Sequence, residues 1–213
     1  MAPLLRPTTA SAEHRSEPAA GWAEPGECVH PAALAAITQL YRRVMPNGGA
    51  ILDLMSGWVS HLPPEIPYRR IVGLGSEACE LAENPFLDEW RVQDLNRDPR
   101  LPFAAAEFDA AALCASVQHL TRPFEVIRDV GRVLKPGAPL VVTFSSCCRA
   151  IEPIACWRLL DDAGHLCLVA RYFAEAGNWT GIRCLDLTPG DGRDPLYAVL
   201  GRSLGPAASG TAD

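Results

Sequence analysis

The sequence ILDLMSGWVSH, residues 51–61, changes character halfway along its length. Apart from Asp53, its first four residues are apolar, which is typical of a strand that is buried on both faces. The residues after this strand have the position of a ligand-binding loop, but Gly57 is the only glycine among them. Met55 and Val59 are large, whereas a close backbone approach to a ligand favours small residues. The stretch therefore predicts a strand followed by an unusual loop.

The segments around this strand alternate between helical and extended patterns. We predict further strands over residues 69–75, 89–96, 108–116, 140–146, 181–188 and 196–202. We predict helices over residues 31–45, 76–84, 122–134, 152–163 and 165–176, with Thr121 as the cap of the third. Most of the strands are apolar throughout, as in parallel sheets covered by helices. The expected fold class is α/β: a Rossmann-like, doubly wound, mostly parallel seven-stranded sheet with helices on both faces.

Length and composition narrow the class of protein. The 213 residues fit one domain over residues 28–203, between a Pro/Ala/Glu/Ser-rich tail at 1–27 and a tail at 204–213. The formal net charge of −6 argues against a surface that binds nucleic-acid phosphates. The chain contains no run of eighteen apolar residues, so we expect no membrane span and a cytoplasmic location. None of the eight cysteines forms a C-x-x-C pair, and we expect no metal site.

The string GLGSEA, residues 73–78, matches a dinucleotide fingerprint placed after a strand and before a helix. Asp94 follows about twenty residues later, where an acid that binds ribose is expected. Glu77 opposes this interpretation, because its carboxylate would repel a phosphate at the start of the helix. An NAD(P)-dependent oxidoreductase is therefore one of the functions that the sequence allows.

Taken together, four segments resemble class I S-adenosylmethionine-dependent methyltransferases of the small-molecule, type 11 branch. They are ILDLMSG (51–57), IVGLGS (71–76), VQDLNRDPRLPFAAAEFDAAALCASVQHL (92–120) and IRDVGRVLKPGAPLVVTFS (127–145). Their order and spacing carry the resemblance, and the final R-V-L-K-P-G turn is among the most specific parts. The string LMSGWVSHLP, residues 54–63, is similar to a divergent branch of that family.

The resemblance implies that the cofactor is S-adenosyl-L-methionine and that the residues binding it follow the strands. These residues are Asp53, Met55, Ser56, Gly57, Gly75, Ser76, Asp94, Leu95, Ala115 and Ser116. By position, Asp53 would order the first loop and Asp94 would bind the adenine amino group. Ala115 and Ser116 would line the methionine end. One departure is that Gly75 stands where the family has its ribose-binding acid, and Glu77 is two residues away from that position.

Methyl transfer requires mainly that the acceptor is positioned and desolvated, with a base only where the acceptor loses a proton. His119 and His61 are the candidate bases, and each has an alternative structural role in holding a loop. The aromatic residues Trp58, Trp157, Tyr172 and Trp179 are candidates for an acceptor pocket or for the core. The predicted function is methyl transfer to a small-molecule acceptor. The alternative is a catalytically inactive methyltransferase fold with a binding or regulatory role.

Overall fold

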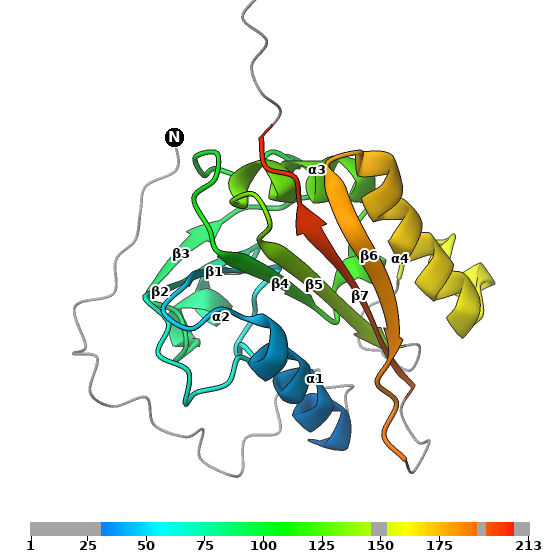
Figure 1. Cartoon of the computed structure of the whole chain (residues 1–213), viewed down its shortest axis with the longest axis horizontal. Helices are drawn as coiled ribbons and strands as arrows, with labels where there is room; N and C mark the ends of the chain where they lie inside the picture. The colour runs from blue at the N-terminus through cyan, green and yellow to red at the C-terminus, as the bar shows by residue number, and fades with distance from the viewer. Residues whose placement is uncertain (1–30, 146–152, 191–194, 207–213) are drawn as a thin grey trace, which may run out of the picture.

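Seven strands form a single sheet in the order β3-β2-β1-β4-β5-β7-β6 (Figure 1). The computed structural model describes residues 31–145, 153–190 and 195–206. Five strands are mutually parallel: β1 (Ala50–Leu54), β2 (Arg70–Gly75), β3 (Glu89–Val92), β4 (Ala110–Cys114) and β5 (Pro139–Ser145). The last two, β6 (Trp179–Asp186) and β7 (Leu196–Ser203), pair antiparallel, and β7 is also antiparallel to β5. The predicted seven-stranded, mostly parallel sheet is therefore confirmed.

Apolar side chains cover both faces of the sheet, because alternate residues of each strand point to opposite sides. In β1, Leu52 and Leu54 belong to one buried cluster and Ile51 belongs to another. Residues of helix α1 (Pro31–Val44) pack into the cluster that contains Ile51. Residues of α3 (Pro123–Val133) and α4 (Asp162–Ala176) pack into the cluster that contains Leu52. Figure 1 accordingly shows α1 well apart from α3 and α4.

The order of the strands reverses between β1 and β4. After β1 the chain proceeds to β2 and then β3 on one side, and it returns to form β4 and β5 on the other. Because β1 and β4 are parallel neighbours, with Leu54 opposite Leu113, their carboxyl ends meet at the same edge. Ligands of open α/β sheets bind at this kind of switch point. The topology therefore directs attention to the residues that follow β1 and β4.

Two predicted elements differ from the observed ones. Within the described residues 153–163, the predicted helix is reduced to a short 3₁₀ turn, η2 (Trp157–Leu159). The reason is that Asp161 is extended and caps a new helix, accepting a hydrogen bond from the backbone N–H of Gly164 at 2.8 Å. Helix α4 consequently begins at Asp162, three residues before the predicted start of 165–176. The predicted tail at 1–27 lies outside the described residues.

The third helix begins differently from the prediction. Its cap residue is Arg122, which makes no side-chain capping bond, so the assignment of Thr121 as the cap is wrong. The Thr121 hydroxyl instead lies 3.0 Å from the Oδ1 atom of Asn96, to which it donates. Asn96 also donates through Nδ2 to the backbone oxygen of His119. The loop after β3 is thereby tied to the loop after β4.

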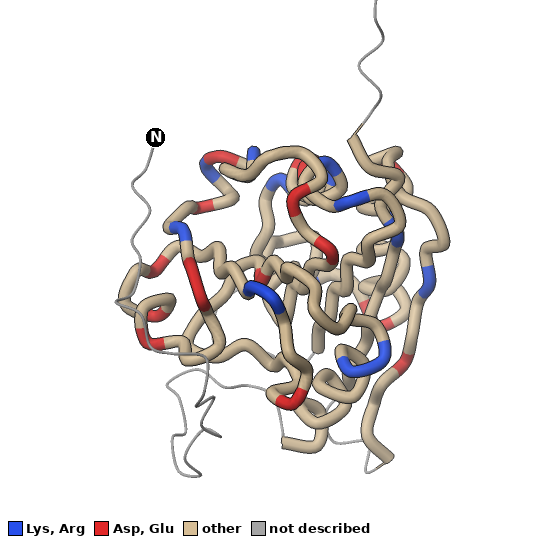
Figure 2. Tube along the Cα trace, turned by 60° about the vertical axis from the view of Figure 1, so that its left-hand side comes forward, with Lys and Arg blue, Asp and Glu red and all other residues tan. Residues whose placement is uncertain are grey.

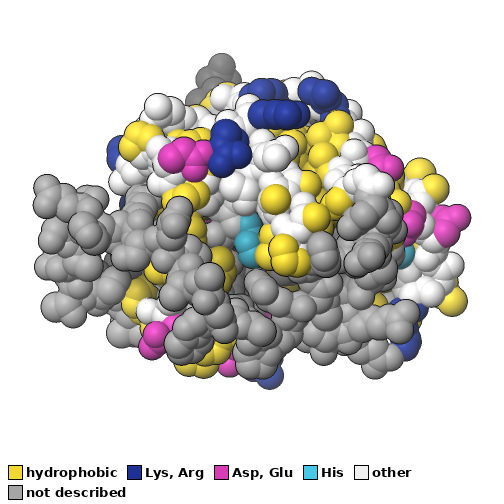
Figure 3. Space-filling view, turned by 90° about the horizontal axis from the view of Figure 1, so that it is seen from below, with side chains coloured by type: hydrophobic (Ala, Val, Ile, Leu, Met, Phe, Trp, Pro, Cys, Tyr) yellow, Lys and Arg dark blue, Asp and Glu magenta, His cyan; other side chains and the backbone are white. Residues whose placement is uncertain are grey.

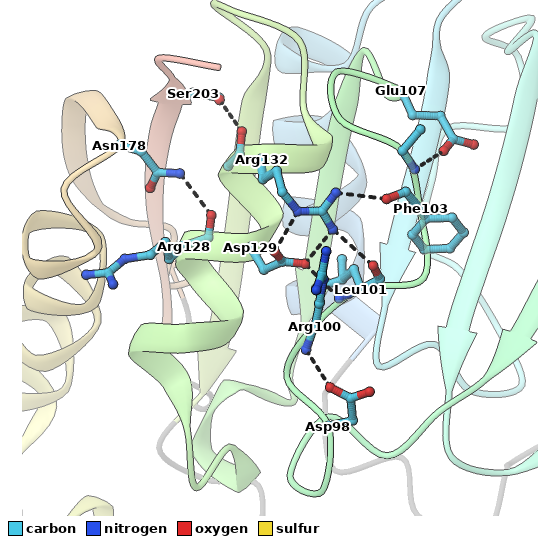
Figure 4. A network of polar contacts seen from close by, with 12 residues as sticks. Asp98, Arg100, Leu101, Phe103, Glu107, Arg128, Asp129, Arg132, Asn178 and Ser203 are labelled. Carbon is cyan, nitrogen blue, oxygen red and sulfur yellow. Dashed lines mark hydrogen bonds and ion pairs between the residues drawn. The ribbon is translucent and has the colours of Figure 1, made fainter. Parts of the chain in front are cut away.

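The guanidinium group of Arg132 joins two of the segments that carry the family resemblance (Figure 4). It forms a bidentate ion pair with Asp129, with both N–O distances at 2.7 Å. It also donates to the backbone oxygens of Phe103 at 2.9 Å and of Leu101 at 3.0 Å. The ion pair with Asp129 raises the pKa of Arg132. The LPF turn, residues 101–103, is thus held against α3 by the arginine of the R-V-L-K-P-G motif.

Charged residues of both signs are interspersed along the trace in the view of Figure 2. The formal net charge of the chain is −6. Among the helices that the structure describes, none has the length and apolar character needed to cross a bilayer.

Candidate functional site

Two residues other than glycine adopt the left-handed backbone conformation directly after the central parallel strands. Met55 follows β1 with φ 51°, and Ala115 follows β4 with φ 49°. Such conformations cost about 1–3 kcal/mol each, and they cluster where a ligand or a reaction requires a particular backbone path. Both residues lie at the point where the strand order reverses. The structure therefore brings together two of the predicted cofactor-binding positions, which are 60 residues apart in sequence.

The loop after β1 folds back on the carboxylate of Asp53. The hydroxyl of Ser56 donates to Asp53 Oδ2 at 2.7 Å, and the hydroxyl of Ser60 donates to the same oxygen at 2.5 Å. All three side chains are buried. Asp53 therefore orders this loop through serine side chains of the loop itself.

Asn84, which follows helix α2 (Ala78–Glu83), holds the same loop from the other side. Its Nδ2 atom donates to the backbone oxygen of Gly57 at 2.8 Å and to the hydroxyl of Ser60 at 3.2 Å. Its Oδ1 atom accepts from the backbone N–H of Phe86. Neither Asn84 nor Ser60 was identified from the sequence, because no motif marks them and their role depends on contacts across 24 residues.

Burial controls the charge of the Asp53 carboxyl group. Loss of hydration raises its pKa to about 6, although the hydrogen bonds from Ser60 and Ser56 oppose the shift. At neutral pH the group is therefore mostly ionised, and it is the acceptor of both hydroxyl groups. The pKa of the Tyr41 phenol in α1 is also raised. Burial is the largest cause, followed by the interactions with Cys114 and with the Asp53 carboxylate.

The loop after β1 also closes against the end of β2. The backbone N–H of Ser56 donates to the oxygen of Leu74 at 2.9 Å. The backbone oxygen of Ser56 lies 2.3 Å from the point that a Cβ atom on Gly75 would occupy. Any side chain at position 75 would collide with the loop. The path of the loop after β1 therefore requires glycine at position 75, so no acid can stand there.

The two glycines of the GLGSEA string have a packing role. Both lie inside β2 rather than in a loop. A Cβ atom on Gly73 would lie 2.4 Å from a methyl group of Leu87, and one on Gly75 would lie 3.2 Å from a methyl group of Leu81. The glycines therefore make room for neighbouring side chains and for the Ser56 carbonyl. This observation removes the main physical support for a dinucleotide loop at this position.

The loop after β3 presents the second predicted acid. The strand ends at Val92, four residues earlier than predicted, so Asp94 lies in a turn rather than in the strand. Its Oδ1 atom accepts from the backbone N–H of Asn96 at 2.9 Å, and Oδ2 is 3.6 Å from the guanidinium of Arg97. The Asp94 side chain is 44% exposed, whereas Leu95 is buried. Asp94 is therefore accessible to a ligand at this edge of the sheet.

The loop after β4 is held by its own side chains. Ser116 donates through its hydroxyl to the oxygen of Cys114 at 2.7 Å. Gln118 donates through Nε2 to the oxygen of Ala115 at 2.8 Å, which supports the left-handed conformation of that residue. No motif in the sequence marks Gln118, whose side chain is 1% exposed. Its backbone oxygen accepts from Ile154, so this loop also anchors the start of the segment that leads into α4.

The two predicted histidine bases lie in different loops. His61 ends the loop after β1, and its backbone oxygen accepts from the hydroxyl of Thr38 in α1. Burial lowers the pKa of His61, so its imidazole is neutral at neutral pH. His119 lies at the end of the 3₁₀ turn η1 (Val117–His119), after β4. The view from below shows a histidine side chain within a hollow bordered by hydrophobic side chains (Figure 3).

Three of the four aromatic candidates belong to the core. Trp157 stacks on His165 with 4.1 Å between ring centroids, and Trp179 donates through Nε1 to the oxygen of Ile127. Tyr172 packs edge-on against a neighbouring phenyl ring and is 2% exposed. Trp58 is partly exposed in the loop after β1. Of this group, Trp58 is the residue that lies in a loop at the edge where the parallel strands end.

Comparisons with known proteins agree with this geometry. A family model described as a methyltransferase domain matches residues 73–142. A comparison with curated protein sequences gives no significant match.

Solved structures share the fold at low sequence identity. An S-adenosylmethionine-dependent methyltransferase from Mesorhizobium loti is 17% identical with a TM-score of 0.57, over 79% of this chain and 98% of that chain. A geranyl diphosphate C-methyltransferase from Streptomyces coelicolor is 14% identical with a TM-score of 0.57, over 79% and 80%. The [4+2]-cyclase SpnF is 16% identical with a TM-score of 0.53, over 81% of each chain. Over residues 73–142 the chain is therefore similar to a methyltransferase domain, and over most of its length it shares the fold of S-adenosylmethionine-dependent methyltransferases.

Proposed function

We propose that this chain binds S-adenosyl-L-methionine across the carboxyl ends of β1 and β4 and transfers its methyl group to a small-molecule acceptor. The observation that carries the proposal is the pair of left-handed residues, Met55 and Ala115, at the switch point of the sheet. Gln118 bonds the backbone oxygen of Ala115, and Ser56, next to Met55, bonds Asp53 and Leu74, as expected where a ligand defines the required path. The fold alone is insufficient, since it also supports a cyclase.

The residues at this edge suit the chemistry of the proposed cofactor. S-Adenosylmethionine carries no phosphate, so a glycine-rich cradle of backbone amides is unnecessary. Its sulfonium is a cation, and the ionised Asp53 at the end of β1 favours positive charge nearby. Asp94 offers an accessible carboxylate to the adenine amino group. When bound, the cofactor supplies an activated methyl group, and the protein has to align and desolvate the acceptor.

We assign the role of base, for an acceptor that must lose a proton, to His61 or His119. A neutral imidazole accepts a proton, and the lowered pKa of His61 keeps that side chain neutral at pH 7. His119 belongs to the same loop as Ser116 and Ala115, which are assigned to the methionine end of the cofactor.

A second candidate function is non-catalytic binding by a chain that keeps the methyltransferase fold. The closure of Ser56 against Gly75 favours it, because this contact takes the place of a side chain at the end of β2. The two candidates differ in whether the edge of the sheet accepts the cofactor.

Titration calorimetry with S-adenosylhomocysteine, S-adenosylmethionine and NADH separates these functions. The proposal predicts saturable binding of the first two ligands and none of NADH. Asp94→Ala is expected to weaken binding of S-adenosylhomocysteine by about tenfold or more, from the loss of a charge-assisted hydrogen bond. Asp98→Ala, a change in the same loop, is the control and should leave the affinity within twofold. If the wild-type chain binds neither adenosyl ligand, the methyltransferase proposal is wrong.

A further inference from the structure

The side chain of Asn96 joins two loops at the carboxyl edge of the sheet. Asn96 itself lies in the loop after β3 and is partly buried. Its Nδ2 atom donates to the backbone oxygen of His119, in the loop after β4, at 3.0 Å. Its Oδ1 atom accepts from the backbone N–H of Thr121 at 2.8 Å and from the Thr121 hydroxyl at 3.0 Å. Both ends of the amide group are therefore bonded to the loop after β4.

The backbone of the same residue belongs to the turn around Asp94. The Asn96 N–H donates to Asp94 Oδ1 at 2.9 Å. The backbone oxygen of Asp94 accepts from the N–H groups of Arg97 at 3.1 Å and Asp98 at 3.0 Å, which closes the turn. A ligand that bonds the Asp94 carboxylate therefore acts on a group that already accepts a hydrogen bond from Asn96.

A second link between the two loops is weaker. The Nη1 atom of Arg122 lies 3.4 Å from the backbone oxygen of Arg97, and this exposed guanidinium is already paired with Glu125. Exposed contacts of this kind contribute little, because water competes for both partners. Asn96 makes three bonds through a short side chain with few rotatable bonds. A displacement of Asn96 therefore also displaces the loop after β4.

We infer that Asn96 is a positioning residue that couples cofactor binding at Asp94 to the orientation of His119. The inference rests on the proposed function, in which Asp94 binds the adenine amino group and His119 is one of two candidate bases. A bound adenine shares the Asp94 carboxylate with the Asn96 N–H. The other end of Asn96 holds the carbonyl group of His119 itself, so the two sites are joined by a continuous set of hydrogen bonds. The base is thereby aligned when the cofactor is in place.

Nuclear magnetic resonance of the full chain, with ¹³C-labelled histidine rings, tests the inference during titration with S-adenosylhomocysteine. The chain contains five histidines, and His119→Gln identifies the His119 signal by its loss. Saturation of the wild-type chain is expected to shift this signal. Asn96→Asp keeps an acceptor for Thr121 and the backbone N–H for Asp94, but it has no donor for the His119 carbonyl. In Asn96→Asp the shift at saturation should fall by about half or more.

Two controls separate this coupling from a general effect on the site. Calorimetry should give a dissociation constant of Asn96→Asp for S-adenosylhomocysteine within about threefold of wild type. The ring signal of His61, in the loop after β1, should shift equally in both proteins. Thr121→Val removes a bond of the same network but leaves the donation from Asn96 to His119, and it should retain the shift of the His119 signal. Asn96→Ala, which removes every side-chain bond of Asn96, should lose it.

The possible failures are distinguishable. Equal shifts of the His119 signal in wild type and in Asn96→Asp overturn the assignment of Asn96 and leave the proposed function standing. Binding by the wild-type chain without a shift of this signal overturns it as well. Loss of ligand binding in Asn96→Asp, with unchanged thermal unfolding, also overturns it, because Asn96 would then serve the turn around Asp94 alone. No binding by the wild-type chain overturns the proposed function and this inference together.

Discussion

The backbone carbonyl oxygen of Ser56 lies 2.3 Å from the point where a Cβ atom on Gly75 would begin. This relationship couples the loop after β1 to the end of β2, and it explains why an acid is absent from that end. Substitution of Gly75 by alanine should therefore force the loop away from the sheet.

Gly75→Ala is expected to lower the free energy of unfolding by about 1–3 kcal/mol, as overpacking against backbone atoms typically does. Urea unfolding measures the change. Gly190→Ala is the control, because no atom of the residues that the structure describes lies within 4 Å of its Cβ position, chain neighbours aside. An equal effect of the two substitutions would contradict the close approach at Gly75.

The buried carboxyl group of Asp53 should make stability depend on pH in an unusual direction. Its pKa is raised to about 6 in the folded chain, above the ordinary value of 3.8. Between these values the folded state retains a proton that the unfolded state has released, so the contribution of this group falls as pH rises from about 4 to about 6. Asp53→Asn removes the titration.

The difference in unfolding free energy, Asp53→Asn minus wild type, should therefore increase between pH 4 and pH 7 by roughly 2–3 kcal/mol. Other carboxyl groups, such as Asp109 with its lowered pKa, are present in both proteins and cancel in the difference. Urea unfolding at several pH values provides the measurement. A difference that stays constant over this range would show that Asp53 titrates normally.

Much of this fold could be predicted from the sequence, since strand patterns such as that of β1 are local. Asp53 was also identifiable, because a carboxylate at the end of an apolar strand needs partners. Its partners were not identifiable. Ser60 and Asn84 reach the loop through contacts that depend on how α2 packs on the sheet, and neither residue belongs to a motif. The left-handed conformation of Met55 could not be predicted either. Glycine usually marks such positions, and methionine gives no sign of one.

Asn84→Ala should loosen the loop after β1, because the Gly57 carbonyl and the Ser60 hydroxyl lose their donor. The expected cost is about 1–3 kcal/mol in local stability, which appears as faster amide hydrogen exchange over residues 55–60. Asn178→Ala removes a similar bond, to the backbone oxygen of Arg128, and is the control. If the amides of the loop exchange at the same rate in the two variants, Asn84 does not hold the loop in place.

Arg132→Ala should destabilise the chain by about 2–3 kcal/mol, because it removes a bidentate ion pair and leaves two carbonyl oxygens without their donor. Arg132→Lys should recover little, since an ammonium group cannot span the same partners. Arg171→Ala breaks an exposed pair with Glu175 and should cost about 0.3–0.5 kcal/mol. Thermal unfolding measures the stability of the three variants. Similar losses of stability for Arg132→Ala and Arg171→Ala would contradict the claim that Arg132 holds the LPF turn against α3.

The central claim is that the cofactor lies across the carboxyl ends of β1 and β4. Nuclear magnetic resonance titration of the ¹⁵N-labelled chain with S-adenosylhomocysteine tests it most directly, because each backbone amide reports on its own surroundings. The account predicts saturable shifts of the amides of Met55, Gly57 and Ala115 together with those of Asp94 and Leu95. An absence of shifts, or shifts confined to residues away from this edge, would contradict it.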